Sequence, residues 1–266
     1  MAPAFDSDAP SLLRIRGLIK DFRGLRALDN YLLDLRAGEI LGVIGPNGAG
    51  KTTLFNLITG LLRPTAGRIV WEGRDITRAS PDAVARMGIA RTFQNIRLFN
   101  AMSVLDNVKV AQQLHSPVDP AGVLLSAPYF MRREAALTER ALEVLRFFDL
   151  ERYAFHPAAS LAYGDQRRLE MARALATQPR LLLLDEPTVG MNPSESQELL
   201  QLIRMLHERY QLTLVLVAHD MRLVMGLCQR LQVLSNGRTI AQGEPAEVRS
   251  HPEVIEAYLG KAHSYA

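Results

Sequence analysis

The spacing of apolar and polar positions along this chain predicts strands of two kinds. Residues 12–22 and 27–35 alternate enough for strands with one buried face. Two later runs, 181–184 and 212–217, are apolar at successive positions, which is typical of parallel strands buried on both faces. A similar apolar run covers 40–44. The pattern therefore predicts an α/β chain that contains a parallel sheet.

Shorter signals add further strands. The pair Asn236-Gly237 lies between two short segments, 231–234 and 238–241, and predicts a hairpin. Short strands are also expected at 68–72 and 90–93.

Helical periodicity accounts for much of the remaining chain. It predicts helices at 53–58, 165–177, 194–210 and 252–259. Ser194 and Gln197 have the spacing of a capping box, so the third of these helices is expected to begin at Ser194. Ser103 and Asp106 similarly indicate the start of another helix.

The block from 95 to 160 is expected to be mainly helical. Apolar residues recur there at helical spacing: Leu137, Ala141, Val144, Leu145 and Phe148. Turn-forming residues mark a loop within it: Pro117, Pro120, Gly122 and Pro128. We therefore expect a single domain over 11–260 with a helical subdomain inserted at 95–160. A flexible N-terminus is expected at 1–10 and a helical tail at 244–266.

Composition and charge remove several function classes. The chain has 266 residues, 48% of them hydrophobic, which is enough for a sizeable core. Its net charge of +3 comes from scattered residues, so nucleic-acid binding has no support from a basic block. The single cysteine, Cys228, excludes an internal disulfide framework, and we interpret it as a packing residue. Residues 1–10 lack the apolar segment of a signal peptide, and no run reaches the roughly 20 apolar residues needed to cross a bilayer.

The segment 45–53 predicts a phosphate-binding loop. It matches the pattern G-x-x-x-x-G-K-S/T, and it follows a predicted strand and leads into a predicted helix. Backbone N–H groups of such a loop, and the N-terminus of the helix after it, point toward phosphate oxygens. Lys51 places a charge near the β- and γ-phosphates, and the Thr52 hydroxyl suits Mg²⁺. The expected nucleotide-binding residues are Gly45, Pro46, Asn47, Gly48, Ala49, Gly50, Lys51, Thr52 and Thr53.

Polar residues at the ends of other predicted strands complete a hydrolytic site. Asp185 and Glu186 follow a buried apolar run, and strand ends in open α/β sheets face the ligand. Asp185 is expected to hold Mg²⁺, and Glu186 to orient or deprotonate the attacking water. His219 follows the next buried strand, from which it can reach the γ-phosphate and the water. Gln94 ends another strand and offers its amide to Mg²⁺ or to water, so it is the third candidate catalytic residue.

One further segment precedes a predicted helix and the strand that ends in Asp185. It consists of Leu161, Ala162, Tyr163, Gly164 and Asp165. This segment resembles the signature motif of ATP-binding cassette proteins, usually Leu-Ser-Gly-Gly-Gln, and the order of motifs is similar to that family over almost the whole chain. The resemblance extends to the loop 189–192 and to Phe22, which matches the aromatic residue that stacks on adenine.

The resemblance implies a fold and a shared site. The fold is a P-loop NTPase core with a parallel sheet, an antiparallel β subdomain and an inserted helical subdomain. Two subunits enclose two ATP molecules with Mg²⁺, and each signature helix faces the γ-phosphate that the other subunit holds. Here Ala162 replaces the usual Ser, Tyr163 replaces a Gly and Asp165 replaces the Gln. Ala162 lacks one γ-phosphate donor among several, and hydrolysis is expected to be retained.

The altered signature is itself similar to one group within the family. Together with the segments 91–99, 219–226 and 257–260, it resembles the longer ATP-binding subunit of bacterial branched-chain amino-acid importers. That resemblance implies a second ATPase subunit, like or unlike, two transmembrane permease subunits and an external solute-binding protein, with no nucleic acid. It also implies a position at the cytoplasmic face of the bacterial inner membrane, held through the permease subunits.

Other functions stay open at this point. Related ATPases serve importers of urea or short amides, or the export of lipopolysaccharide. Soluble cassette ATPases that act on nucleic acid or ribosomes usually carry a long coiled-coil insertion or two cassettes in one chain, and neither is present here. A regulator that binds nucleotide without hydrolysing it is disfavoured by Glu186 and His219.

Two sets of residues have more than one interpretation. In the family, a groove beside the loop that contains Gln94 receives a short cytoplasmic helix of the permease. Four apolar residues are candidates for that groove or for ordinary core: Ile96, Leu98, Phe99 and Met102. The pairs Arg132-Arg133 and Arg167-Arg168 are candidates for contact with lipid headgroups, although a solvated helix face is favoured.

Overall fold

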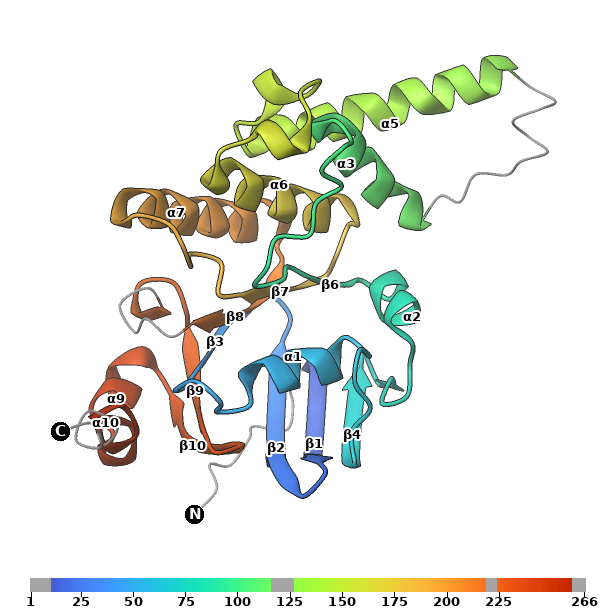
Figure 1. Ribbon diagram of the computed structural model, residues 1–266. Helices are drawn as coiled ribbons and strands as arrows, with labels where there is room; N and C mark the ends of the chain where they lie inside the picture. The colour runs from blue at the N-terminus through green and yellow to red at the C-terminus, as the bar shows by residue number, and fades with distance from the viewer. Residues whose placement is uncertain (1–10, 116–126, 219–223, 260–266) are drawn as a thin grey trace.

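Two β-sheets and a set of helices make up the fold (Figure 1). The computed structural model describes residues 11–115, 127–218 and 224–259. One sheet has four strands in the order β2-β1-β4-β5, and the other has six in the order β10-β9-β3-β8-β7-β6. The predicted α/β class is therefore confirmed, with one antiparallel sheet and one mainly parallel sheet.

The antiparallel sheet contains the two alternating segments near the N-terminus. Its strands are β1 (Ser11–Phe22), β2 (Leu25–Arg36), β4 (Ala66–Trp71) and β5 (Arg74–Asp75). β1 pairs antiparallel with both β2 and β4. Leu13 and Ile15 are fully buried, two positions apart, because successive side chains of a strand point to opposite faces. The alternation thus located β1 and β2 to within two residues.

The six-stranded sheet contains the strands that are apolar at successive positions. These strands are β3 (Ile40–Ile44), β6 (Ile89–Arg91), β7 (Leu181–Asp185), β8 (Thr213–Ala218), β9 (Arg230–Ser235) and β10 (Arg238–Gly243). β3, β7 and β8 are buried at every position, as expected for parallel strands covered on both faces. β9 and β10 form the predicted hairpin, and Asn236 and Gly237 both have positive φ angles.

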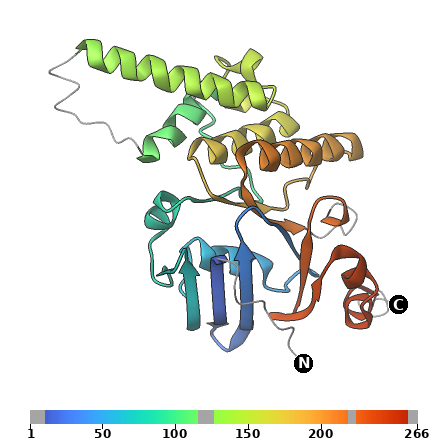
Figure 2. The same ribbon diagram turned by 180° about the vertical axis from the view of Figure 1, so that it is seen from behind.

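The parallel sheet separates two hydrophobic clusters. The helices are α1 (Lys51–Ile58), α2 (Pro81–Arg86), α3 (Val104–Gln112), α5 (Ala127–Phe147), α6 (Tyr163–Ala176), α7 (Pro193–Tyr210), α9 (Pro245–Arg249) and α10 (Pro252–Leu259). On one face of the sheet, Leu183 and Val215 pack with α1 and the antiparallel sheet. On the other face, Leu182 and Leu214 pack with α3, α5, α6 and α7. Figures 1 and 2 show this helical layer at one end of the molecule and the antiparallel sheet at the other.

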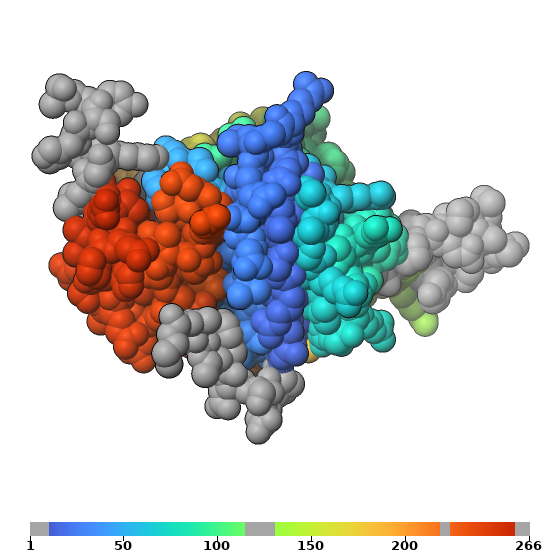
Figure 3. Space-filling view, turned by 90° about the horizontal axis from the view of Figure 1, so that it is seen from below, coloured from blue at the N-terminus to red at the C-terminus, as the bar shows by residue number. Residues whose placement is uncertain are grey.

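The C-terminal helices lie beside the β9–β10 hairpin. α9 contacts both strands of the hairpin, and α10 contacts β10. Seen from below, β1 and β2 lie between these C-terminal segments and the segment that contains β4 and α2 (Figure 3). Within the described ranges, no helix has the length and apolar character needed to span a membrane.

Two local predictions are wrong. α7 begins at Pro193, and its N-cap is Asn192 rather than a residue further on. The Asn192 side chain accepts the Glu195 N–H at 3.0 Å, and the Glu195 carboxylate accepts the Asn192 N–H at 2.9 Å. These two bonds satisfy the helix start, so Ser194 has no capping role. Pro128, expected in a loop, lies in the first turn of α5, where the missing N–H of proline needs no partner.

Candidate functional site

Four strands of the parallel sheet end at the same edge. β3 pairs with β8 and β8 with β7 in parallel, so Ile44 lies opposite Ala218, and Asp185 lies opposite Val217. β6 pairs in the same direction with β7. The phosphate loop, the acidic pair and the loop after β6 therefore all begin at this edge, where ligands of open α/β sheets bind. His219 follows β8 in the sequence and lies outside the described residues.

One side of the phosphate loop is fixed by close backbone contacts. Gly45 has a φ of 152°, and a Cβ there would lie 2.1 Å from the carbonyl oxygen of Leu234, so only glycine fits. Lys51 is 6% exposed, and its Nζ donates hydrogen bonds to the carbonyl oxygens of Gly45 at 2.7 Å and Pro46 at 3.0 Å. The ammonium group is therefore held across the start of the loop, beside the N-terminus of α1.

The other side of this loop faces solvent. Asn47, Gly48 and Thr52 are exposed, whereas Ala49 is buried. The Ala49 carbonyl accepts the N–H of Gly237 at 3.0 Å, which ties the loop to the β9–β10 hairpin. The first N–H groups of an α-helix lie beyond its internal hydrogen bonds, and such a terminus is a common binding site for an anion. The predicted residues 45–53 thus form a loop with an anchored side and an accessible side.

Asp185, the predicted metal ligand, forms a buried ion pair. Arg91 donates from Nη2 to Asp185 Oδ2 at 2.7 Å, and the two side chains are 5% and 3% exposed. Arg91 also donates to the side-chain oxygen of Asn56 on α1 at 2.6 Å. The Asp185 N–H donates to Thr92 Oγ1 at 3.3 Å. Arg91 therefore connects the ends of β6 and β7 with α1, and sequence reasoning gave it no such role because its two partners are distant in the chain.

Gln94 and Glu186, two predicted catalytic residues, are in contact. Gln94 Nε2 donates to the Glu186 carboxylate at 3.1 Å. Glu186 has a φ of 48°, and its N–H donates to the Val217 carbonyl oxygen at 2.9 Å. A positive φ in a residue other than glycine costs roughly 1–3 kcal/mol. The backbone therefore turns away from β7 at Glu186, and the Glu186 carboxylate lies beside Gln94.

The side chains around Asp185 suit Mg²⁺ that is bound together with phosphates. In the described ranges, no group of three or more His, Cys, Asp or Glu residues could form a metal site made of protein alone. Asp185 has a second carboxylate oxygen, Gln94 an amide oxygen and Thr52 an exposed hydroxyl. Mg²⁺ takes oxygen ligands and commonly combines one or two protein groups with substrate phosphates. The three predicted metal-binding residues therefore fit this ion.

The signature segment forms the N-terminus of α6. Ala162 is the N-cap, and no side chain caps the helix, so the N–H groups of its first turn are available to an external anion. Leu161 is buried in the core, whereas Tyr163 is 42% exposed. The Tyr163 hydroxyl donates to the carbonyl oxygen of Val189 at 2.9 Å. Asp165 lies in the first turn, where a negative charge interacts favourably with the helix dipole.

Arg167 lies beneath the loop 92–95, called here the Gln94 loop. It is 3% exposed, so both interpretations of this residue, a lipid contact and a solvated helix face, are wrong. Arg167 Nη1 donates to the Phe93 carbonyl at 2.8 Å and to the Glu170 carboxylate at 3.2 Å. Burial raises the pKa of Glu170, while the Phe93 N–H and the Arg167 charge oppose that rise. The Arg–Glu spacing of three on a helix is the sequence signal for this pair.

The position of Phe22 is compatible with its predicted stacking role. It is the last residue of β1 and pairs with Leu25 across the hairpin. Its side chain is 40% exposed, and Lys20 Nζ lies 4.9 Å from the ring centroid. A ring with an accessible part and a nearby cation can stack on a base. Adenine stacking on Phe22 stays a prediction.

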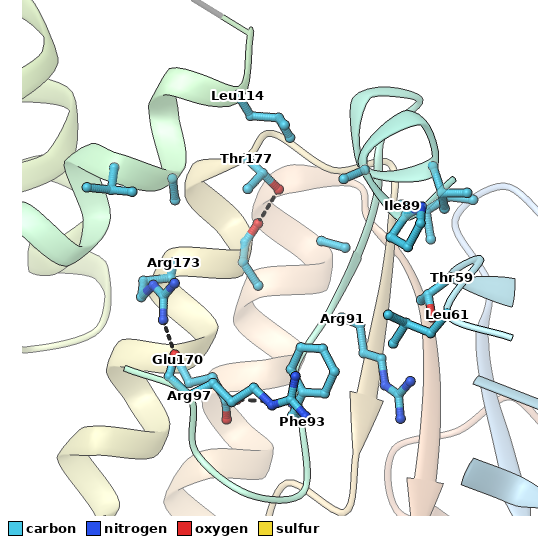
Figure 4. A pocket seen from close by; sticks show the side chains of 17 residues that line it. Thr59, Leu61, Ile89, Arg91, Phe93, Arg97, Leu114, Glu170, Arg173 and Thr177 are labelled. Atoms are coloured by element: carbon cyan, nitrogen blue, oxygen red, sulfur yellow. Dashed lines mark hydrogen bonds between the residues drawn. The ribbon is translucent and has the colours of Figure 1, made fainter. Parts of the chain in front are cut away.

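A groove of about 500 Å³ lies between the end of α1, the strand β6 and the helices α2, α3 and α6. Glu170 and Arg173 lie on one side of it, and Thr59 and Leu61 lie on the other (Figure 4). Phe93 belongs to the lining as well, so the groove adjoins the Gln94 loop. The four apolar residues that were candidates for such a groove or for ordinary core do not line it: Ile96, Leu98, Phe99 and Met102.

A phosphate loop between a parallel strand and a helix, with acidic residues at the end of a nearby strand, defines this chain as a P-loop NTPase. The ABC transporter family matches residues 28–189, and the chain belongs to that family. A second match, to the branched-chain amino acid ATP-binding cassette transporter family, covers residues 238–264. The predicted ABC ATPase fold and ATP-hydrolysing activity are confirmed by these matches together with the relatives below.

Known relatives span nearly the whole chain. The high-affinity branched-chain amino acid transport ATP-binding protein LivG of Salmonella typhimurium is 46% identical over 94% of this chain and 98% of its own length. A solved ADP conformation of an ABC transporter cassette is 31% identical, with a TM-score of 0.81 over 94% of this chain and 99% of that one. A dimeric cassette bound to ADP and Pi is 26% identical, with a TM-score of 0.75 over 88% and 98% of the two chains.

Proposed function

We propose that this chain is the ATP-hydrolysing subunit of an importer for branched-chain amino acids. The observation that carries the proposal is the 46% identity to a branched-chain amino acid transport ATP-binding protein, over 94% of this chain. The match of residues 238–264 to the corresponding cassette family supports the same substrate class. The chain would act at the cytoplasmic face of the inner membrane, where ATP is available, while a solute-binding protein supplies the amino acid from outside.

The site residues divide the hydrolytic work. The phosphate loop and Lys51 hold the β- and γ-phosphates, and Phe22 stacks on the base. Thr52 and Asp185 would hold Mg²⁺, which would supply positive charge to offset that of the phosphates. The Glu186 carboxylate accepts a proton from the attacking water, and Gln94, at 3.1 Å from it, fixes the direction of that carboxylate. His219 is assigned to the γ-phosphate from its place after β8.

A second ATPase subunit would complete each site. The uncapped N-terminus of α6, at Ala162, offers N–H groups to a phosphate that this subunit's own loop does not hold. The relative that is dimeric in its ADP- and Pi-bound state supports a sandwich of two cassettes. The partner subunit is either a second copy of this chain or an unlike ATPase.

The groove beside the Gln94 loop is the proposed contact with the permease subunits. Its lining combines apolar residues such as Val84 and Leu114 with the charged residues Arg97 and Arg173. A short amphipathic helix buries its apolar face in such a groove while its polar residues meet the charged rim. Because Phe93 lines the groove and Gln94 contacts Glu186, a helix bound there would lie next to the hydrolytic site.

Reconstituted transport tests the proposal. The chain, its partner ATPase and the permease pair are placed in proteoliposomes with the solute-binding protein, and uptake of radiolabelled leucine is followed with ATP on the cytoplasmic side. We expect ATP-dependent uptake that Lys51→Ala abolishes and that Lys109→Ala, which removes an ion pair to Glu134 in the helical layer, leaves in place. Uptake of urea or a short amide without leucine would contradict the substrate class. ATP hydrolysis without any association with a permease would contradict the transport role.

A further inference from the structure

We propose that Tyr163 and Arg167 are positioning residues that fasten the Gln94 loop and the loop 189–191 to the N-terminal turns of α6. Through these contacts the signature helix sets the orientation of Gln94 toward Glu186. The inference rests on the proposed hydrolytic roles of Gln94 and Glu186. It assigns to Tyr163 a function inside its own subunit, in place of the contact with the partner's ATP that the family resemblance implied.

Arg167 holds the Gln94 loop by its backbone. Its Nη1 donates to the Phe93 carbonyl at 2.8 Å, and its Nη2 donates to the Gln94 carbonyl. The Glu170 carboxylate adds to this hold, because it accepts the Phe93 N–H at 3.0 Å and an Arg167 N–H at 3.2 Å. The contacts of Tyr163, Arg167 and Glu170 with the two loops are called the clamp below. Arg167 and Glu170 are 3% and 6% exposed, so these charge-assisted bonds form away from water, where they are strong.

The strand β6 ends where this loop begins. The N–H of Thr92 donates to the Leu183 carbonyl at 2.9 Å, as a ladder bond would, but the next ladder donor, the Asp185 N–H, bonds to Thr92 Oγ1 at 3.3 Å instead of to a backbone carbonyl. This explains why β6 ends at Arg91 rather than at the expected residue 93. Beyond Thr92, α6 holds the backbone of the Gln94 loop, through Glu170 at the Phe93 N–H and through Arg167 at the Phe93 and Gln94 carbonyls.

The Tyr163 hydroxyl extends the clamp to the loop after Glu186. It donates to the Val189 carbonyl at 2.9 Å and accepts from Arg167 Nη2 at 2.9 Å and Nε at 3.2 Å. A phenol has one donor and about two acceptor sites, so this hydroxyl has no further bond to give a nucleotide. Gly190 has a φ of 82°, and a Cβ there would lie 3.0 Å from the Tyr163 ring, so glycine permits this close packing.

The contacts form one continuous path across the site. Tyr163 fixes Val189, which follows Glu186 by three residues, and Arg167 fixes the backbone of Gln94. The Gln94 side chain then donates to Glu186 at 3.1 Å. A small displacement of a catalytic group can lower a rate by about 100-fold. Loss of the clamp is therefore expected to lower kcat without changing the residues that bind ATP.

Hydrogen exchange of the full chain tests the clamp directly. The variants are Tyr163→Phe, which removes one hydroxyl and keeps the ring, and Arg167→Gln. Arg168→Gln is the matched control, since Arg168 is the adjacent arginine and pairs at the surface with Glu198 at 2.9 Å. We expect Arg167→Gln to raise amide exchange about tenfold or more in residues 92–95 and 189–191. Tyr163→Phe should raise it in 189–191 and also in 92–95, because the Tyr163 hydroxyl bonds to Arg167, which holds that loop. Arg168→Gln should change neither segment.

Kinetics of the assembled importer separate positioning from a structural role. We expect Tyr163→Phe to lower kcat about tenfold with KM for ATP unchanged. In a Gln94→Ala background the same substitution should change kcat less than twofold, because its effect passes through Gln94. The inference would be overturned if amide exchange in Tyr163→Phe and Arg167→Gln equalled that in Arg168→Gln. It would also be overturned if Tyr163→Phe lowered kcat equally in the wild type and in the Gln94→Ala background. An inactive wild-type complex would count against the proposed function alone, since the exchange comparison decides the inference by itself.

Discussion

The guanidinium of Arg91 lies 2.7 Å from the Asp185 carboxylate, and both side chains are almost fully buried at the edge of the parallel sheet. Asp185 is the predicted Mg²⁺ ligand, so one of its oxygens serves this ion pair and the other is available to the metal. Arg91 also bonds to Asn56 on α1, the helix that begins with Lys51. The geometry of the acidic residue is therefore tied to the helix of the phosphate loop.

Arg91→Met should destabilise the fold strongly. Removing one partner of a buried ion pair leaves the other charge uncompensated, which costs about 3–5 kcal/mol. We expect a loss of this size in the free energy of urea unfolding, and Asp185→Asn in the Arg91→Met background should restore part of it. Arg180→Met, which removes a more exposed pair with Glu72, is the control and should cost less than about 1 kcal/mol. Equal losses for both arginine variants would contradict the assignment of Arg91 to a buried pair.

The observed start of α7 gives a second prediction. Asn192→Ala should lower the free energy of unfolding by about 1 kcal/mol, because Asn192 accepts the Glu195 N–H at the N-cap. Ser194→Ala should stay within about 0.5 kcal/mol of the wild type, since Ser194 is exposed and lies one position inside the helix. Thermal or urea unfolding of the two variants measures both values. The reverse order would indicate that the helix begins where the sequence pattern first suggested.

Cys228 should react slowly with alkylating reagents. It is 7% exposed, and burial raises the pKa of its thiol from 9.0 to about 12. Only the thiolate is nucleophilic, so iodoacetamide at pH 8 should label the folded chain far more slowly than the urea-unfolded chain. Because it is the only cysteine, mass spectrometry gives the labelled fraction without ambiguity. Equal labelling of the two states would contradict the burial.

The same thiol predicts a dependence of stability on pH. Its folded pKa lies above the unfolded value of 9.0, so the folded state keeps its proton when the unfolded state has lost it. The contribution to stability is full below about pH 9 and is lost as pH rises from 9 toward about 12. The stability of the wild type relative to Cys228→Ala should therefore fall over that window and stay constant between pH 6 and about pH 8. A difference that does not change between pH 8 and about pH 10 would contradict it.

The sequence was sufficient for the features that depend on local pattern. Continuous apolar runs identify β7 and β8 because a parallel strand is covered on both faces. The order of glycine, lysine and threonine in 45–53 identifies the phosphate loop. Glycines let the backbone approach phosphates, lysine supplies a positive charge and threonine supplies a hydroxyl for Mg²⁺. The contact between Gln94 and Glu186 is consistent with their expected positions at the ends of strands that the structure places side by side.

Features that depend on the packing of distant segments were not predicted. The pair of Arg91 and Asp185 requires β6 to lie beside β7, and nothing local to either residue reveals that order. Arg167 is a charged residue beside a second arginine on a predicted helix, a pattern typical of an exposed helix face. In the fold, however, the Gln94 loop covers it. The cap of α7 was misplaced by two residues because a Ser–Gln spacing and an Asn–Glu spacing overlap there, and side-chain geometry decides between them.

ATP hydrolysis at this site is proposed to depend on Glu186, which accepts the proton of the attacking water. The most direct measurement is the ATPase rate of the importer assembled with Glu186→Gln, with ATP binding followed in the same preparation. We expect a kcat at least about 100-fold below that of the wild type, with ATP still bound, because amide and carboxylate have similar shape but different basicity. A rate within a few-fold of the wild type would contradict it and would assign the proton transfer to another residue.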